Sequence, residues 1–91
     1  MQPIRKKLTT EWVEFATFIN TTVNTNDKYR LCNRGNSDIL LLETDTAPAV
    51  DNIDGDPLVT NEKVTFTKPE SSTLYLRALN DETYINITKV S

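Results

Sequence analysis

Short stretches of alternating apolar and polar residues recur along the C-terminal half of the chain. In EKVTFT, at 62–67, Val64 and Phe66 are two positions apart, and the same alternation runs through TLYLRAL at 73–79 and TYINITKV at 83–90. Residues two apart in a strand lie on one face of a sheet. Turn residues separate the three segments. The pattern therefore predicts three strands.

Two further strands are predicted in the first half of the chain. In KYRLCN, at 28–33, Tyr29 and Leu31 share one face. The run ILLLETD, at 39–45, begins as a continuous apolar stretch, which is typical of a central strand covered on both faces. Between them lies RGNSD, in which Gly35 can take a positive φ. We expect the two strands to form a hairpin.

The segment EWVEFATFI, at 11–19, fits two interpretations. Trp12, Phe15 and Ile19 have the spacing of one helix face, but the aromatic and β-branched content and the following polar run favour a strand. We predict a strand here. The stretch 46–61 holds two prolines, a glycine and several acids, and is expected to be a long connection without regular structure.

Together these segments predict an all-β fold, a small antiparallel β-sandwich or barrel of about six strands. The chain has 91 residues, enough for one domain, which we place at 11–91. Residues 1–10 are expected to form a flexible basic arm, because Arg5, Lys6 and Lys7 stand there without an acidic residue. Few devices protect the strand edges, so pairing with neighbouring subunits is expected.

Charge adds a second feature to this picture. After residue 10 the chain holds seven basic and thirteen acidic side chains, so a basic arm precedes an acidic body. The arm is either a solvated tail or a peg that docks on an acidic neighbouring surface. Three cations neutralise few phosphates, so nucleic acid is not an expected partner. No membrane-spanning run and no secretory signal are present, which predicts a protein made in a cytoplasm.

The content of cysteine and histidine limits the chemistry. The chain has one cysteine, Cys32, and no histidine. An intrachain disulfide, a Cys/His zinc site and any histidine base are therefore excluded. Cys32 lies in an apolar stretch and is expected to be a small buried hydrophobe. Paired carboxylates, as in a glycosidase, would need a cleft that so small a domain hardly provides. We predict no enzymatic activity, no catalytic residues and no cofactor.

The hexapeptide DNIDGD, at 51–56, raises the question of a metal loop. Aligning Gly55 with the glycine of a helix-flanked calcium loop leaves Val50 and Asn61 at two essential ligand positions. The favoured interpretation is an exposed turn with Pro57 at its exit and no metal. The alternative is an irregular calcium site formed by Asp51, Asp54 and Asp56.

Trp12 is the only tryptophan of the chain. With neighbouring phenylalanines it could form a platform on which a sugar stacks. The only tryptophan of a small domain more often belongs to the core or to an interface, and that is the interpretation we favour.

Four motifs follow one another from Tyr29 onward. They are a turn with asparagine, a hydrophobic strand that runs into a proline loop, a V-T-F strand after a glycine, and an L-Y-L-R-A strand. Their residues are Asn33–Gly35, Ile39–Pro48, Val64–Phe66 after Gly55, and Leu74–Ala78. In this order the segment resembles the small all-β virion proteins encoded among the structural genes of tailed bacteriophages. The resemblance covers about two-thirds of the chain, and residues 1–27 lie outside it.

The resemblance implies a structural role in the virion, which is assembled in the host cytoplasm. The expected protein is a head decoration protein, a homotrimer that binds the major capsid protein. Arg5, Lys6 and Lys7 would then anchor the arm to the capsid, and Trp12 would be buried at a subunit contact. A tail, collar or baseplate protein is the nearest alternative, and a small carbohydrate-binding module is the lesser one.

Overall fold

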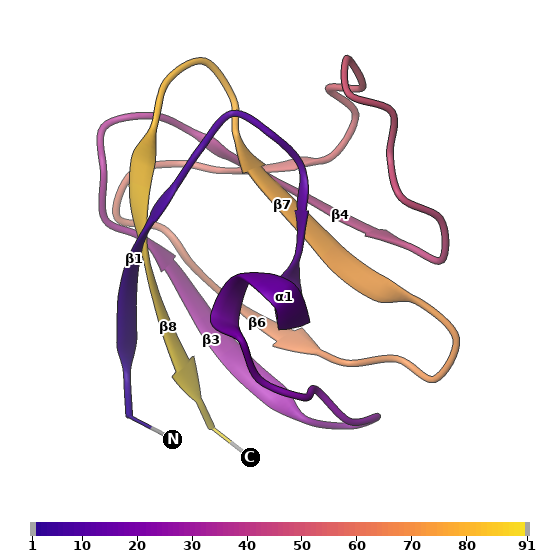
Figure 1. The fold of residues 1–91 in the computed structure, drawn as a ribbon. Coiled ribbons are helices and arrows are strands. Elements are labelled where there is room, and N and C mark those ends of the chain that lie inside the picture. Colours follow the sequence, from indigo (N-terminus) through magenta and orange to yellow (C-terminus); the bar gives the residue numbers. More distant parts are fainter. Residues whose placement is uncertain (1, 91) are drawn as a thin grey trace.

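Two four-stranded antiparallel sheets pack face to face in the computed structural model, which describes residues 2–90 (Figure 1). Sheet A has the spatial order β1 (Ile4–Leu8), β8 (Thr83–Lys89), β3 (Lys28–Asn33), β6 (Lys63–Thr67). Sheet B has the order β2 (Val13–Glu14), β7 (Thr73–Ala78), β4 (Ile39–Thr44), β5 (Asp56–Leu58). The predicted all-β sandwich is confirmed, with eight strands instead of about six.

The order of the strands defines a jelly roll. β1 pairs with β8, β2 with β7, β3 with β6 and β4 with β5, so the two halves of the chain run antiparallel like one long hairpin. Rolling this hairpin brings β3 beside β8 and β4 beside β7, which closes the two sheets. Eight strands in two such sheets are the jelly-roll architecture.

The core lies between the two sheets and follows the predicted alternation. Tyr29 and Leu31 are fully buried while Lys28 and Arg30 are exposed. The ring of Phe15 meets the ring of Tyr29 edge to face, with 4.9 Å between centroids. Cys32 is buried, as predicted.

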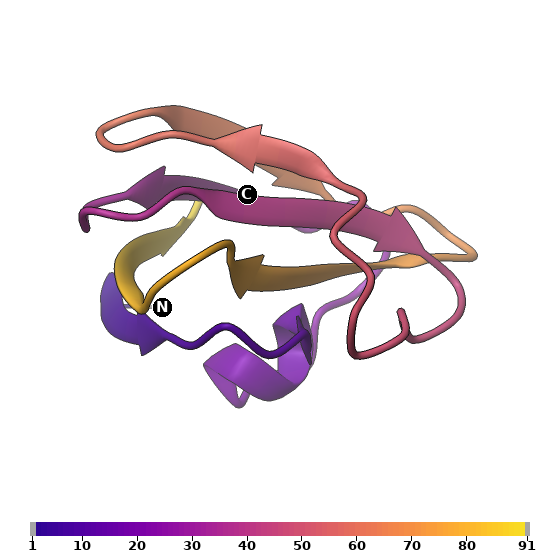
Figure 2. The same cartoon turned by 90° about the horizontal axis from the view of Figure 1, so that it is seen from above.

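The two long seams of the sandwich are closed differently. At the seam between β1 and β2 lies the short helix α1 (Phe15–Ile19), whose Phe15, Phe18 and Ile19 join the core. At the opposite seam the edges belong to β5 and β6, which a tight turn connects. In Figure 2 the violet α1 and the salmon segment that holds β5 and its turn to β6 lie at opposite sides of the molecule.

The prediction of a free arm at residues 1–10 is wrong for the segment that forms β1. Ile4–Leu8 pairs with β8 over five residues, from Ile4 opposite Ile87 to Leu8 opposite Thr83. Leu8 is 1% exposed and belongs to the core. The alternation of apolar and polar residues does not predict this strand, because three consecutive basic residues separate its two apolar residues, Ile4 and Leu8.

The prediction of a strand over 11–19 is wrong for most of its length. Only Val13 and Glu14 are in a strand, and a one-turn helix follows at Phe15–Ile19. The helix ends at Asn20, which takes a left-handed conformation with φ 53°. The helix buries Phe15, Phe18 and Ile19 on one face, and this burial outweighs the β propensity of the aromatic residues.

The predicted hairpin of 28–33 and 39–45 is also wrong, because β3 and β4 belong to different sheets. Each is an inner strand with two other neighbours, so the turn between them crosses from sheet A to sheet B. The connection 46–61 likewise is not entirely irregular, since it contains β5. In the described part of the chain, no helix has the length and apolar character needed to cross a membrane.

Asn33, at the end of β3, fixes this crossing. Its buried side-chain amide donates to the carbonyls of Ser37 and Leu58, each at 2.8 Å. Its Oδ1 accepts from the N–H of Gly35 and from the hydroxyl of Thr83, each at 3.1 Å. One side chain thus joins three turns at one end of the sandwich, and every hydrogen-bonding group of its amide is used.

Candidate functional site

The strands of sheet A carry a charge opposite to that of the rest of the molecule. They hold seven of the ten basic residues, three in β1, two in β3 and one each in β6 and β8, and none of the thirteen acidic residues. The strands of sheet B hold three acidic residues and one basic residue, Arg77. A basic sheet is therefore built into an acidic protein.

Most of the charge of sheet A lies on its outer face, because neighbouring residues of a strand point to opposite faces. Tyr29 and Leu31 fill the core, so Lys28 and Arg30 project outward. The register of the strands then places three more exposed basic residues on the same side. We call this surface the basic face, and its cations are Arg5, Lys7, Lys28, Arg30 and Lys63.

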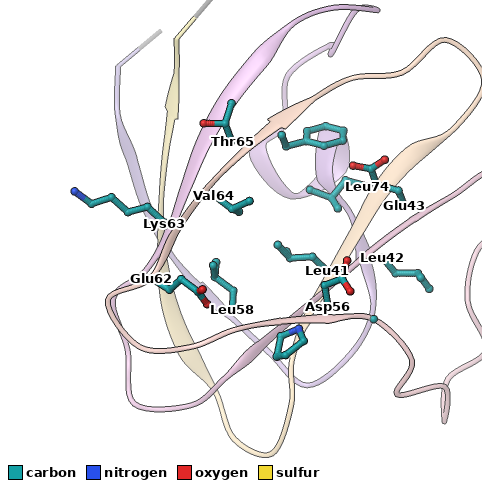
Figure 3. Close-up of a pocket in the computed structure, with 13 residues that line it drawn as sticks. Leu41, Leu42, Glu43, Asp56, Leu58, Glu62, Lys63, Val64, Thr65 and Leu74 are labelled. Atoms are coloured by element: carbon teal, nitrogen blue, oxygen red, sulfur yellow. The ribbon is translucent and has the colours of Figure 1, made fainter.

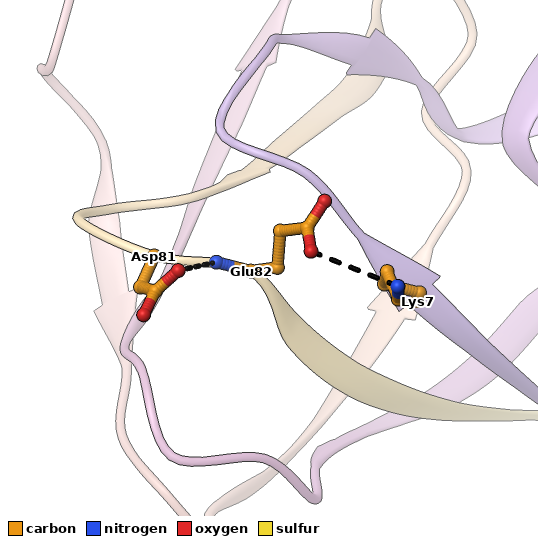
Figure 4. Close-up of polar contacts among 3 residues, drawn as sticks. All are labelled: Lys7, Asp81 and Glu82. Atoms are coloured by element: carbon orange, nitrogen blue, oxygen red, sulfur yellow. Dashed lines mark hydrogen bonds and ion pairs between the residues drawn. The ribbon is translucent and has the colours of Figure 1, made fainter.

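The three basic residues predicted to anchor the chain divide between the two sides of β1. Arg5 lies over the ring of Tyr84, 4.9 Å from its centroid, and Lys7 pairs with Glu82 at 3.7 Å on the outer side (Figure 4). Lys6 points the other way and donates to the carbonyl of Phe18 at 2.6 Å. Lys6 thus ties β1 to α1 and is not part of the basic face.

Acidic residues stand at both ends of the basic face. Glu82 pairs with Lys7, and its N–H donates to the carboxylate of Asp81 at 2.9 Å (Figure 4). At the other end Asp27 pairs with Lys89 at 3.7 Å. The side chain of Asp27 is mostly buried and its charge acts on the inward-facing Tyr29, so an exposed acid bounds the basic face at the end of Glu82.

Trp12 does not belong to the basic face but holds the loop between β4 and β5. Its indole N–H donates to the carbonyl of Asn52 at 2.7 Å, and the guanidinium of Arg77 lies 5.9 Å from its ring centroid. The side chain is half-buried. A sugar platform needs an aromatic face open to solvent.

The DNIDGD segment forms a turn in this loop. The N–H of Asp54 donates to Oδ1 of Asn52 at 2.7 Å, and Gly55 has φ 151°, a value that favours glycine. Over residues 2–90 no group of three or more histidine, cysteine, aspartate or glutamate side chains could hold a metal ion. Val50, just before this segment, is 86% exposed, and Ile53, within it, is 63% exposed.

A groove of about 610 Å³ opens along the seam between β5 and β6 (Figure 3). Leu58, Phe66 and Leu74 line it with buried apolar side chains, and Val64, which is 38% exposed, stands at its wall. Its acidic lining residues are Glu43, Asp56 and Glu62. The side chain of Lys63 extends away from it in Figure 3. The groove is apolar inside with an acidic rim.

One titratable group of the core has a shifted pKa. Burial, and after it the negative charge of Asp27, raises the pKa of Tyr29 above its ordinary value of 10.0. Within residues 2–90 its hydroxyl has no hydrogen-bond partner. The shift therefore reports burial and not an activated phenol.

Comparison with known proteins adds no relative to this picture. No family model matches the chain, and no curated protein or solved structure matches it. What the chain does has to be argued from its surfaces.

Proposed function

We propose that this chain is a non-enzymatic structural protein of a bacteriophage virion, and that it decorates the capsid through the basic face of sheet A. The observation that carries the proposal is the separation of charge, with seven cations and no acid in the strands of one sheet. The phage resemblance of residues 29–90 supports the setting. Jelly rolls also build viral capsid domains, which agrees with the proposal without deciding it.

The basic face replaces the flexible arm as the expected docking surface. Arg5 and Lys7 remain in it, and Lys28, Arg30 and Lys63 extend it across the sheet. An acidic molecule with one basic face meets an acidic surface in a single orientation, because every other approach is repulsive. Such orientation suits a protein that coats a lattice.

The partner that fits this face is an acidic protein surface of limited extent. A long nucleic acid would run past the ends of the face, where Glu82 and Asp27 stand. The exposed carboxylate of Glu82 repels a phosphate backbone. We propose the major capsid protein, which we expected from the resemblance, as this partner.

Charge reversal within the face tests the proposal. We expect Arg30→Glu to lower the affinity for purified capsids about tenfold, since the variant replaces an attraction by a repulsion worth roughly 1–2 kcal/mol. Lys63→Glu in the same chain should lower it further. Co-sedimentation with capsids over a range of protein concentrations measures both effects.

Lys68→Glu is the matched control, because it changes the net charge equally at a residue outside the strands of sheet A. It should bind capsids nearly as the parent does. Equal binding by the parent and by the Arg30→Glu/Lys63→Glu variant would rule out docking through this face. Retention of the parent on DNA, with none on capsids, would point to a polyanion instead.

Imaging of labelled particles separates head from tail. Label over the whole head supports decoration, and label at one vertex supports the tail, collar or baseplate alternative. The carbohydrate-binding alternative requires an accessible Trp12 ring, which half-burial and the nearby Arg77 disfavour. A glycan array on which the parent binds and a Trp12→Ala variant does not would revive it.

A further inference from the structure

Four strands form the edges of the sandwich, and they differ in how well they can pair with another chain. The edges are β1 and β6 in sheet A, and β2 and β5 in sheet B. An edge strand exposes unpaired N–H and C=O groups, and proteins protect such edges with short strands, proline or charge. β2 has only two residues, which makes it a poor template.

Proline blocks the edge of β5. The N–H of Leu79 donates to the carbonyl of Asp38 at 2.8 Å, and this bond continues the register of β4 and β7. The backbone groups of even-numbered residues in β4 therefore bond to β7. Odd-numbered positions therefore bond to β5, where their partners are Leu58 and Asp56. Pro57, between those two, faces outward and has no N–H to donate.

The edge of β6 has no such block. The N–H of Asn33 donates to the carbonyl of Glu62 (3.1 Å), and the N–H of Lys68 donates to that of Asp27 (2.9 Å). Even-numbered positions of β6 thus face β3. The odd-numbered residues of β6 therefore turn their N–H and C=O groups outward at the edge of the sheet. These residues are Lys63, Thr65 and Thr67.

The edge of β1 is the other one that can pair. The N–H of Val90 donates to the carbonyl of Lys28, and the N–H of Arg34 donates to the carbonyl of Tyr84, each at 2.8 Å. The backbone groups of even-numbered residues in β8 therefore bond to β3. The odd-numbered positions of β8 face β1 and meet its even-numbered residues. The backbone groups that β1 turns outward are those of Arg5 and Lys7.

We propose that the β6 edge of one copy of this chain pairs with the β1 edge of a second copy, so that sheet A continues from subunit to subunit. Sheet A has four strands that alternate in direction, so β1 and β6 run opposite to each other. A head-to-tail repeat of the sheet is therefore antiparallel at each junction. This inference rests on the proposed function for its expected number of copies, three in a closed ring.

Charge favours this pairing over the contact of two β6 edges. The groove beside β6 is lined by Glu43, Asp56 and Glu62, so two copies of it would repel each other. β1 instead brings three basic residues, Arg5, Lys6 and Lys7.

The charges also select a register. Lys7 opposite Lys63 would place like charges across the junction, which is destabilising. With Lys7 opposite Thr65 and Arg5 opposite Thr67, the outward backbone groups of both strands still meet. Each junction then adds strand pairing without a charge directly opposite a like charge.

Proline substitutions test the two edges separately. Thr65→Pro removes an outward N–H of β6, and Arg5→Pro removes one of β1, and neither N–H serves the sheet of its own subunit. Each variant is expected to raise the dissociation constant of self-association at least tenfold. Analytical ultracentrifugation from micromolar to millimolar protein, without capsids, measures it. Thr65→Ala keeps the N–H and is expected to associate as the parent does.

A mixture of the two proline variants gives the sharper result. The Arg5→Pro variant keeps its β6 edge and the Thr65→Pro variant keeps its β1 edge, so one junction can form between them. We expect two weakly associating variants to form a one-to-one heterodimer when mixed. Association of the parent that survives Arg5→Pro would overturn the pairing, because contact between two β6 edges does not need β1.

Hydrogen exchange of the parent covers the case in which a proline variant fails to fold. The amides of Thr65 and Lys7 should become protected as the concentration rises, while the amide of an exposed loop residue, Ser71, should not. A parent that stays monomeric at millimolar concentration would refute the inference. Capsid binding by such a monomer would leave the proposed function standing, so the two failures can be told apart.

Discussion

The two long seams of the sandwich differ in how well the core beneath them is covered. Between β1 and β2 the core is sealed by α1, whose Phe15 is fully buried and touches Tyr29 and Phe66 edge to face. Between β5 and β6 a groove of about 610 Å³ stays open and Val64 is 38% exposed. The helix at one seam stabilises the fold, whereas the other seam leaves apolar surface exposed.

Sealing a seam and opening one have different energetic consequences. A buried aromatic ring contributes both transfer free energy and packing, so its loss leaves a cavity. A half-exposed valine contributes less to the free energy of unfolding, because much of its surface stays in water. The difference can be measured by substitutions on each side.

The largest effect is expected at the closed seam. Phe15→Ala should lower the free energy of unfolding by about 3–5 kcal/mol, because the cavity lies between two sheets that cannot collapse into it. Val64→Ala at the open seam should cost less than about 1 kcal/mol. Urea unfolding followed by the fluorescence of Trp12 measures both variants. Equal costs at the two positions would mean that the seams do not differ.

A second large effect is expected where the end of the open seam is fixed. Asn33→Ala should lower the free energy of unfolding by roughly 2–4 kcal/mol, since the carbonyls of Ser37 and Leu58 and the hydroxyl of Thr83 lose their partner. Asn36→Ala, at an exposed position of the same turn, should change it by less than about 0.5 kcal/mol. Urea unfolding compares them, and similar costs would argue against the network.

Much of the fold could be predicted from the alternation of residues in single strands. The segments 28–33, 62–67, 73–79 and 83–90 all contain strands, and their inward residues lie in the core with one exception. The exception is Val64, which alternation places inward but which the open seam exposes. Periodicity gives the side of a strand on which a residue lies, and not whether another element covers it.

The short and polar elements could not be predicted in this way. β1 has three basic residues in five, and β5 has three residues with a proline in the middle. Both are strands because a neighbouring strand offers them hydrogen bonds, which is a property of the whole fold. The same reason explains the wrong hairpin, since pairing partners are chosen between distant segments.

The basic face was missed for a related reason. The segments 28–33 and 83–90 visibly contain basic residues and no acid, so part of the signal stands in the sequence. Only the sheet order shows that these segments, Ile4–Leu8 and Lys63–Thr67 lie side by side. The surface becomes apparent when basic and acidic residues are counted for each sheet instead of for each segment.

A smaller effect is expected for Trp12, which lies on the closed side of the sandwich. Trp12→Phe keeps an aromatic ring but removes the hydrogen bond to the carbonyl of Asn52, so we expect a loss of about 0.5–1.5 kcal/mol. Circular dichroism has to follow unfolding, because the variant lacks the tryptophan. The loop 46–55 should also be cleaved faster by protease, whereas the β5–β6 turn should not. Unchanged cleavage would mean that Trp12 does not hold the loop.

The smallest effect at neutral pH is expected for Tyr29, whose ring lies between the two seams and pairs in register with Phe66. Tyr29→Phe removes a buried hydroxyl without a partner, so stability at pH 7 should change by less than about 0.5 kcal/mol or rise. The two proteins should differ in alkaline solution. The pKa of Tyr29 is raised in the folded state, so the unfolded chain loses this proton first.

The contribution of Tyr29 to stability is therefore complete below its unfolded value of 10.0 and is lost as the pH rises toward the raised pKa of the folded state. The parent should lose stability above pH 10 more steeply than the Tyr29→Phe variant. Urea unfolding at several alkaline pH values measures the slopes. If the Tyr29→Phe variant falls as steeply as the parent, the interior between the seams admits water to the phenol, and the closed seam is less tightly sealed than its packing indicates.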